Sequence, residues 1–232
     1  MISTRASFIQ ELSEVDRKLL RMGGIVRGMI ADAVASFLNG ELNRVETVFG
    51  NDDLVDSLEA EVESTCLQLL ALQQPMARDL RRVSSAIKVA SELERMGDHA
   101  VLIVKYARKL HMECFPLRPL IDLERMSAVA EQMLDDSLSA FIHHDIELVK
   151  SVCVDDDIVD AEYKDARRQL IELASQDSSN AAAATYTILV AGSIERIADH
   201  ATNIAERVAY LETGVFQRLS KAHRIPRDSD KP

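Results

Sequence analysis

Acidic residues recur in pairs at four places in the sequence, and the members of each pair are four positions apart. Because four residues make about one helical turn, both carboxylates of a pair share one face if the segment is helical. Like charges at this spacing repel one another and destabilise the helix. The pattern therefore indicates that something positive lies against each pair. The pairs are Asp52 with Asp56, Glu94 with Asp98, Asp156 with Asp160, and Glu195 with Asp199.

Two sources could supply that positive charge. Lysine or arginine on a facing helix is the plainer one, because acidic stripes on helices are usually solvated or salt-bridged. A metal cation is the other, since hard ions take oxygen ligands and carboxylates from neighbouring helices can bridge several ions. The spacing alone leaves both open.

The two histidines next to these pairs are poorly placed to be metal ligands. Ferritin-like di-metal oxidases need Glu-x-x-His on two helices, but positions 97 and 198 are Gly and Ala. His99 is five residues beyond Glu94, so it is rotated about 140° from that carboxylate around the helix axis. His99 and His200 are therefore expected to support the ligands or to lie on the helix surface.

The sequence offers no other catalytic pattern. It has no Gly-rich phosphate loop, no G-x-S-x-G turn and no zinc-ligand spacing. We therefore expect a protein that is not an enzyme.

The acidic pairs lie in a unit that occurs twice. When the sequence is shifted by 104 positions, 21–56 aligns with 125–160, and 11 of the 36 aligned positions are identical. A second block, 87–103, aligns with 188–204 at a shift of 101, with 9 of 17 identical. The chain is therefore an internal duplication whose second copy lost three residues in a connection.

Each copy is predicted to form three helices. Apolar residues keep a helical period over about 8–37, 42–72 and 76–110, and again over 120–141, 146–174 and 181–211. The breaks fall at Asn39-Gly40, at Gln73-Gln74-Pro75 and after Gly214. Long helices with short connections pack as antiparallel neighbours. The sequence thus predicts an all-α protein of two tandem, homologous three-helix bundles, at 1–115 and 116–214, with a polar tail at 215–232.

Composition restricts the partners and the compartment. The net charge is −11, so nucleic acid and anionic membrane surfaces should be repelled. The amino-terminal segment carries charges within its apolar pattern, and no uncharged run approaches the ~20 residues of a membrane span. Cys66, Cys114 and Cys153 have apolar surroundings and form no C-x-x-C pair, which indicates buried thiols in a reducing compartment. A cytoplasmic protein with no direct membrane insertion is expected.

Several segments together resemble the PhoU family of phosphate-signalling regulators. They are D-D-L-V-D at 52–56, C-L-Q-L-L-A-L-Q-Q-P-M-A-R-D-L-R at 66–81, E-L-E-R-M-G-D-H-A at 92–100, D-D-D-I-V-D at 155–160 and I-E-R-I-A-D-H-A-T-N-I-A-E-R-V at 194–208. The resemblance implies two three-helix bundles side by side, with metal clusters of iron or zinc (manganese or magnesium being alternatives) on the acidic faces. It implies negative regulation of the phosphate-starvation response, by linking the ATPase subunit of a phosphate ABC transporter to a membrane sensor histidine kinase. Exposed helix faces further suggest a homodimer.

The resemblance also implies a set of metal ligands in each copy. Copy two has Asn203 one turn beyond Asp199, whereas copy one has Leu102 there and Lys105 close by. This difference predicts a weaker first site. The implied ligands are Asp52, Asp53, Asp56, Glu94 and Asp98 in copy one, and Asp156, Asp157, Asp160, Glu195, Asp199 and Asn203 in copy two.

Two other functions compete with a metal-binding regulator. A carboxylate-bridged metal enzyme, such as a phosphatase or an oxidase, would need an open coordination position and a nearby acid or base. A metal-free helical adaptor would use the acidic stripes to bind basic surfaces of partner proteins.

Overall fold

The computed structural model describes residues 2–112, 121–216 and 218–219, with side chains from Arg5 onward. Six long helices account for most of them, joined by two short 3-10 turns at Leu42–Arg44 and Ser178–Asn180, and these residues contain no strand. The prediction of an all-α fold of six helices is confirmed. The helices are α1 (Ile2–Asn39), α2 (Val45–Gln73), α3 (Arg78–Met112), α4 (Leu123–His143), α5 (Ile146–Gln176) and α6 (Ala181–Thr213).

The helices end where the sequence places residues that leave the helical conformation. Gly40, with a φ of 70°, follows α1, and Gln74, with a φ of 46°, follows α2 ahead of Pro75. Gly214 adopts the left-handed conformation after α6 and donates its N–H to the carbonyl of Tyr210. The predicted breaks are therefore correct, and the first helix begins earlier than its apolar pattern indicates.

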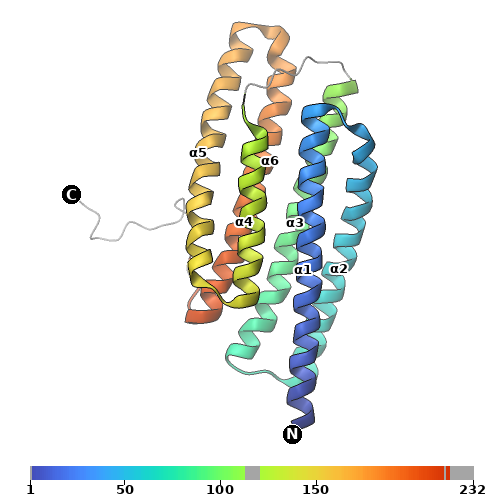
Figure 1. Ribbon diagram of the computed structural model, residues 1–232, viewed down its shortest axis with the longest axis vertical. Helices are drawn as coiled ribbons and strands as arrows, with labels where there is room; N and C mark the ends of the chain where they lie inside the picture. The colour runs from blue at the N-terminus through green and yellow to red at the C-terminus, as the bar shows by residue number, and fades with distance from the viewer. Residues whose placement is uncertain (1, 113–120, 217, 220–232) are drawn as a thin grey trace, which may run out of the picture.

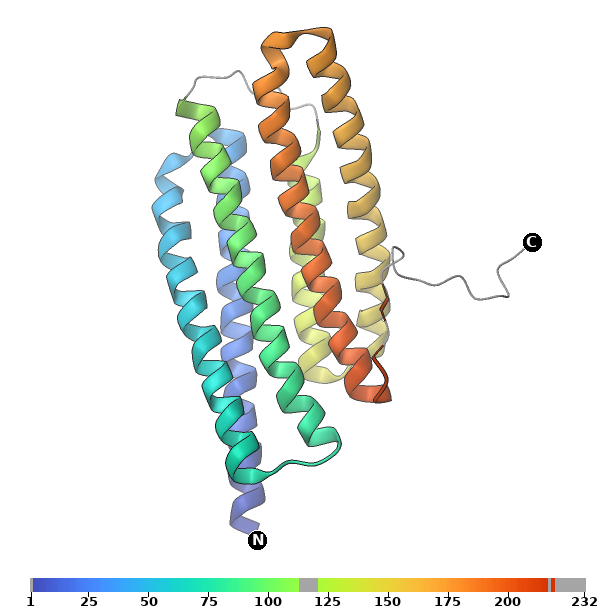
Figure 2. The same cartoon turned by 180° about the vertical axis from the view of Figure 1, so that it is seen from behind.

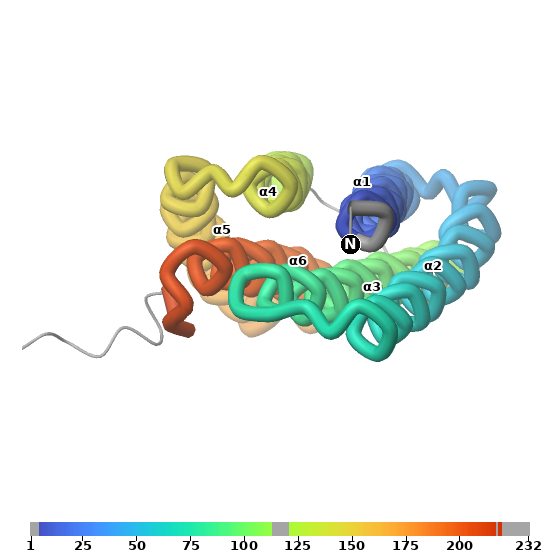
Figure 3. Tube along the Cα trace, turned by 90° about the horizontal axis from the view of Figure 1, so that it is seen from below, coloured from blue at the N-terminus to red at the C-terminus, as the bar shows by residue number. Residues whose placement is uncertain are grey.

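The two halves of the chain form two three-helix bundles that lie side by side (Figure 1). Seen from the end, α3 and α6 are neighbours in the centre of one layer, and α1 and α4 face each other in the other layer (Figure 3). α2 and α5 lie at the two outer edges. The halves therefore meet along two seams, α3 with α6 and α1 with α4.

The core runs through both halves as one cluster of buried apolar side chains. α1 and α4 approach closely at Gly23, where an added Cβ would lie 2.1 Å from Cδ1 of Leu138. The short side chains of Ala90, Ala198 and Ala201 are buried in α3 and α6. Continuous burial across both seams predicts that the halves unfold together.

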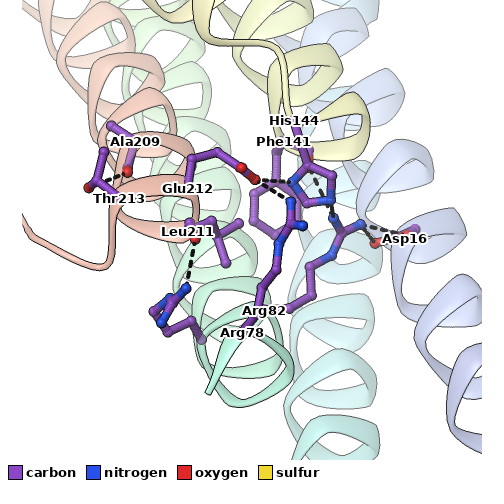
Figure 4. Close-up of polar contacts among 10 residues, drawn as sticks. Asp16, Arg78, Arg82, Phe141, His144, Ala209, Leu211, Glu212 and Thr213 are labelled. Atoms are coloured by element: carbon purple, nitrogen blue, oxygen red, sulfur yellow. Dashed lines mark hydrogen bonds and ion pairs between the residues drawn. The ribbon is translucent and has the colours of Figure 1, made fainter. Parts of the chain in front are cut away.

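A polar network also joins the halves, near the beginning of α3 (Figure 4). Nη2 of Arg82 donates to both carboxylate oxygens of Asp16, at 2.8 and 2.9 Å, and Nη1 donates to Nε2 of His144. Arg78 donates to Oε1 of Glu212 at 2.7 Å, and Nδ1 of His144 lies 3.2 Å from the same oxygen. These side chains come from α1, α3, α6 and the connection between α4 and α5.

The network fixes the protonation of His144. Because an arginine can only donate, Nε2 of His144 must accept, and the proton of the neutral ring is on Nδ1 facing Glu212. Burial, followed by the charge of Arg82, lowers the pKa of His144. The neutral imidazole is thus part of the contact between the two halves.

The cysteines differ in their exposure. Cys66 is buried, as predicted, and burial raises the pKa of its thiol to about 12. Cys153 is partly exposed, and Cys114 is outside the described residues. Among the helices that the structure describes, none combines the length and the low polarity needed to cross a membrane.

Candidate metal centres

The first acidic set lies between α2 and α3. α2 carries Asp52 and Asp56, and α3 carries Glu94 and Asp98 one turn apart. Burial, followed by the charges of Asp56, Asp98 and Asp53, raises the pKa of Asp52 to about 6. Burial likewise raises the pKa of Glu94 to about 7, with Asp98 next in effect. The four carboxylates therefore form one group across two helices, and the negative charge is poorly compensated.

Glu59 is a member of this group that the sequence pattern missed. It lies on α2, and its charge is the third cause, after burial and Asp98, of the raised pKa of Glu94. The duplication obscured it, because the matching position in the second copy is Tyr163. A search for acids three residues beyond Asp56 would have found it.

The helices approach closely at this first set. A Cβ added to Gly97 of α3 would lie 3.5 Å from Oδ1 of Asp52 and 3.5 Å from the methyl carbon of Met29. Asp52 therefore points toward the backbone of α3 rather than into solvent. The corresponding residue of the second copy is Ala198.

The second acidic set lies between α5 and α6. Asp156 and Asp160 come from α5, and Glu195 and Asp199 come from α6. Asp156 is only 6% exposed, and burial, followed by the charges of Asp199 and Asp160, raises its pKa to about 6. Burial is also the first cause of the raised pKa values of Glu195 and Asp199. The duplicated sequence thus builds the same two-helix carboxylate group twice.

The second set has basic partners in direct contact. Nζ of Lys164 lies 2.8 Å from Oδ2 of Asp160. Arg196 contacts Asp199 at 3.0 Å and Glu195 at 3.5 Å. Both basic side chains are more than half exposed, and exposed pairs of this kind contribute little stability. At this set, lysine and arginine side chains therefore supply part of the positive charge that the acidic pairs need.

The first set has weaker compensation. Lys105 lowers the pKa of Asp52, but as the last of its five causes, and Arg95 acts on Glu94 in the same minor way. The ammonium of Lys105 lies 6.0 Å from the centre of the Phe49 ring. Among the described residues, no lysine or arginine lies within ion-pair distance of these four carboxylates, in contrast to the second set.

The three remaining implied ligands lie beside these groups or at the α3–α6 seam. Asp53 is exposed and Asp157 is partly exposed, and each acts on its neighbour in the set, raising the pKa of Asp52 or Asp156. Asn203 differs from the expectation more clearly. Its Nδ2 donates to Oε2 of Glu92 on α3 at 3.0 Å, so the amide is engaged at the α3–α6 seam.

The two histidines also lie at that seam. The rings of His99 and His200 are 5.6 Å apart, and Nδ1 of His200 lies 2.7 Å from Oε2 of Glu92. Burial, followed by the charge of His200, lowers the pKa of His99 to about 4. Burial alone would raise the pKa of Glu92, but the hydrogen bonds from His200 and Asn203 outweigh it and lower that pKa. The histidines therefore join the two halves, as their rotation away from the carboxylate face allows.

The donor chemistry of both sets fits a hard cation. Each set consists of carboxylate oxygens from two helices, the ligand type that di- and trivalent hard ions prefer. Within the described part of the chain, no three His, Cys, Asp or Glu side chains converge closely enough to hold an ion as they stand. Because the carboxylates sit at the ends of rotatable side chains, an ion between two helices would draw them together.

Known proteins share both the sequence pattern and the fold. The family model described as the PhoU domain matches residues 19–107 and 123–208, one match in each copy. A phosphate-specific transport system accessory protein PhoU homolog from Clostridium acetobutylicum is 34% identical over 91% of this chain and 96% of its own length. The crystal structure of PhoU from Pseudomonas aeruginosa superposes with a TM-score of 0.86 at 35% identity, covering 90% of this chain and all of that one. The phosphate transport system regulatory protein PhoU from Streptococcus pneumoniae gives 0.82 at 31% identity, covering 90% and 99%.

Proposed function

This chain belongs to the PhoU family, and we propose that it is an accessory regulatory protein of a phosphate-specific transport system. The observation that carries the proposal is the similarity over both copies at once. The relatives are similar over nearly their whole length, and they are named as accessory or regulatory proteins of phosphate transport. Similarity of this extent covers nearly the whole chain and not a single domain that unrelated proteins share.

The finer proposal is negative regulation through protein partners. We assign to this chain contact with the ATPase subunit of the transporter and with a membrane sensor histidine kinase, in the cytoplasm. Its net charge of −11 supports docking on protein rather than on anionic lipid or nucleic acid. Exposed apolar side chains such as Leu72 and Met76, 77% and 80% exposed, support association with other chains, including a homodimer.

Metal binding on the acidic faces is a separate part of the proposal. Asp52, Asp56, Glu94 and Asp98 would hold ions in the first copy, and their counterparts on α5 and α6 would do so in the second. The raised pKa values of Asp52, Glu94 and Asp156 support the proposal, because burial and then the neighbouring carboxylates make the charged forms of these groups unfavourable. A bound iron or zinc ion, or manganese or magnesium, would neutralise that charge and hold the helices together.

We propose that the protein works without turnover. The accessory and regulatory names of the relatives support this, and the histidines nearest the carboxylates are engaged at the α3–α6 seam. A metal-free adaptor is the second candidate, favoured by the contacts of Lys164 and Arg196 with the second set.

Two measurements on the purified chain test these proposals. Binding to the purified transporter ATPase subunit, followed by light scattering, should give a stable complex, and no complex at micromolar concentrations would count against the regulatory role. Elemental analysis should find iron or zinc in the protein. If the protein holds no metal after reconstitution, the metal-free adaptor becomes the better explanation. Phosphate-ester hydrolysis or oxygen consumption by the metal-loaded protein would instead indicate a metal enzyme.

A further inference from the structure

The chain turns back on itself after α6 and lies against the bundle. Gly214 reverses its direction, and the hydroxyl of Thr213 donates to the carbonyl of Val215 at 3.1 Å and accepts its N–H at 3.2 Å. Figure 2 shows this short piece, in dark red, running back from the end of α6. We call the described residues 215–216 and 218–219 the strap.

The strap makes two kinds of contact with α6. The ring of Phe216 packs edge-on against Tyr210, with centres 6.3 Å apart, and lies 4.8 Å from the guanidinium carbon of Arg207. Farther along, the backbone N–H of Leu219 donates to Oε1 of Glu206 at 2.6 Å. The side chain of Leu219 packs against the common core. An aromatic and an aliphatic side chain, three positions apart, thus fasten the strap.

A pocket of about 360 Å³ lies beside these contacts, and the strap forms part of its wall. Phe216 and Arg218 line it from the strap, Glu92 lines it from α3, and Glu206 lines it from α6. The pocket therefore spans the α3–α6 seam and draws on both halves of the molecule.

Glu206 is an unusual residue for this position. It is only 5% exposed, although the residue at the matching position of the first copy is the exposed Lys105. A buried carboxylate is costly unless hydrogen-bond donors face it, and the strap supplies one from its backbone. The first copy has no acid at this position, so the buried carboxylate is particular to the second copy.

We propose that the face of α6 beneath the strap, at the edge of this pocket, is a docking site for a partner protein, and that the strap covers this site within the same chain. The partner would present an extended segment with an aromatic and an aliphatic side chain three positions apart, as the strap does with Phe216 and Leu219. Any extended segment offers a backbone N–H to Glu206, and the aromatic ring meets Arg207 and Tyr210. The strap itself, seated on the docking site, indicates this chemistry.

The fastening of the strap is weak enough to be reversible. Phe216 remains 46% exposed and Val215 remains 56% exposed, so neither side chain is enclosed by the bundle. A short tether gives the strap an effective concentration on the order of millimolar. A partner segment that binds more tightly than the strap would displace it. This inference does not depend on the role in phosphate transport.

Binding of a synthetic peptide tests the proposal. The peptide has the sequence of residues 214–220 and carries a fluorophore, and its anisotropy is measured with the full chain and with a chain that ends after Gly214. We expect saturable binding to the shortened chain and at least tenfold weaker binding to the full chain. A peptide of the same composition in scrambled order serves as the control.

Variants of the full chain keep the test decisive if the shortened chain does not fold. Phe216→Ala should loosen the strap and raise peptide affinity several-fold, whereas the matched change Val215→Ala should not. Adding Glu206→Gln to Phe216→Ala should reduce the gain. No binding to either the shortened chain or Phe216→Ala, or equal binding to these and the original chain, would overturn the proposal.

Discussion

Replacing Asp16 with Ala should destabilise the protein more than removal of any exposed ion pair, because it leaves a buried guanidinium without its counter-charge. Arg82 is 8% exposed, and its Nη2 donates to both oxygens of Asp16. Removing one partner of a buried pair costs about 3–5 kcal/mol. The side chain of Asp16 is 22% exposed, so water can partly replace it, and we expect about 2–3 kcal/mol. For a chain of this length that lowers the melting temperature by roughly 5–10 °C.

Urea unfolding followed by circular dichroism measures this loss. Arg5→Ala, which removes the exposed pair with Asp79 at the same end of the molecule, is the matched control and should leave the unfolding midpoint nearly unchanged. Combining Asp16→Ala with Arg82→Met should restore part of the stability, because no buried guanidinium then remains, although Nε2 of His144 loses its donor. A loss below about 1 kcal/mol for Asp16→Ala, or no recovery in the double variant, would refute the reasoning.

Three further predictions concern the seams and the metal sets. Because burial lowers the pKa of His144, the unfolded chain takes up a proton at this histidine at a higher pH than the folded chain does, so the free energy of unfolding should fall as the pH falls below 6.5. His144→Asn should reduce this fall in urea titrations between pH 7 and pH 5, and an unchanged dependence of stability on pH would contradict the assignment. Gly23→Val should destabilise the α1–α4 seam by about 2 kcal/mol, since its Cβ would meet Leu138 at 2.1 Å, and normal thermal unfolding would contradict that packing. Metal counting should show that Asp98→Ala loses more bound metal than Asp199→Ala, because basic side chains already contact the second set. A larger loss from Asp199→Ala would instead agree with the weaker first site that the sequence predicts.

The last of these reverses an expectation, and the reason is geometric. The sequence shows Asn203 one turn beyond Asp199, which predicts a third oxygen ligand on one stripe. In the structure the amide is rotated toward α3 and donates to Glu92. That rotation depends on how α6 packs against α3, which no local spacing reveals.

The helices and the duplication, by contrast, follow from local patterns. Apolar periodicity and residues such as Gly40 and Gly214 fix where helices run and end, and the four-residue spacing fixes which carboxylates share a face. Pairing α2 with α3, and α5 with α6, then follows from the short connections. The two acidic sets were therefore predictable down to the helices that carry them.

Contacts between the halves were not predictable in this way. Asp16 and Arg82 are 66 residues apart, and His200 and Glu92 are 108 apart. Each alone looks like an ordinary surface charge. Only the side-by-side packing of the bundles, set by continuous apolar faces on α1, α3, α4 and α6, brings them together. Docking of the strap on Glu206 depends in the same way on tertiary structure.

Gene deletion tests the central claim, regulation of phosphate transport, most directly. Expression of the phosphate-uptake genes is measured in phosphate-replete medium in the parent strain, in the deletion strain, and in the deletion strain that carries the gene on a plasmid. The account predicts that expression in the deletion strain rises to the level of starved cells and that the plasmid restores repression. Unchanged expression in the deletion strain, with phosphate uptake also unchanged, would contradict it.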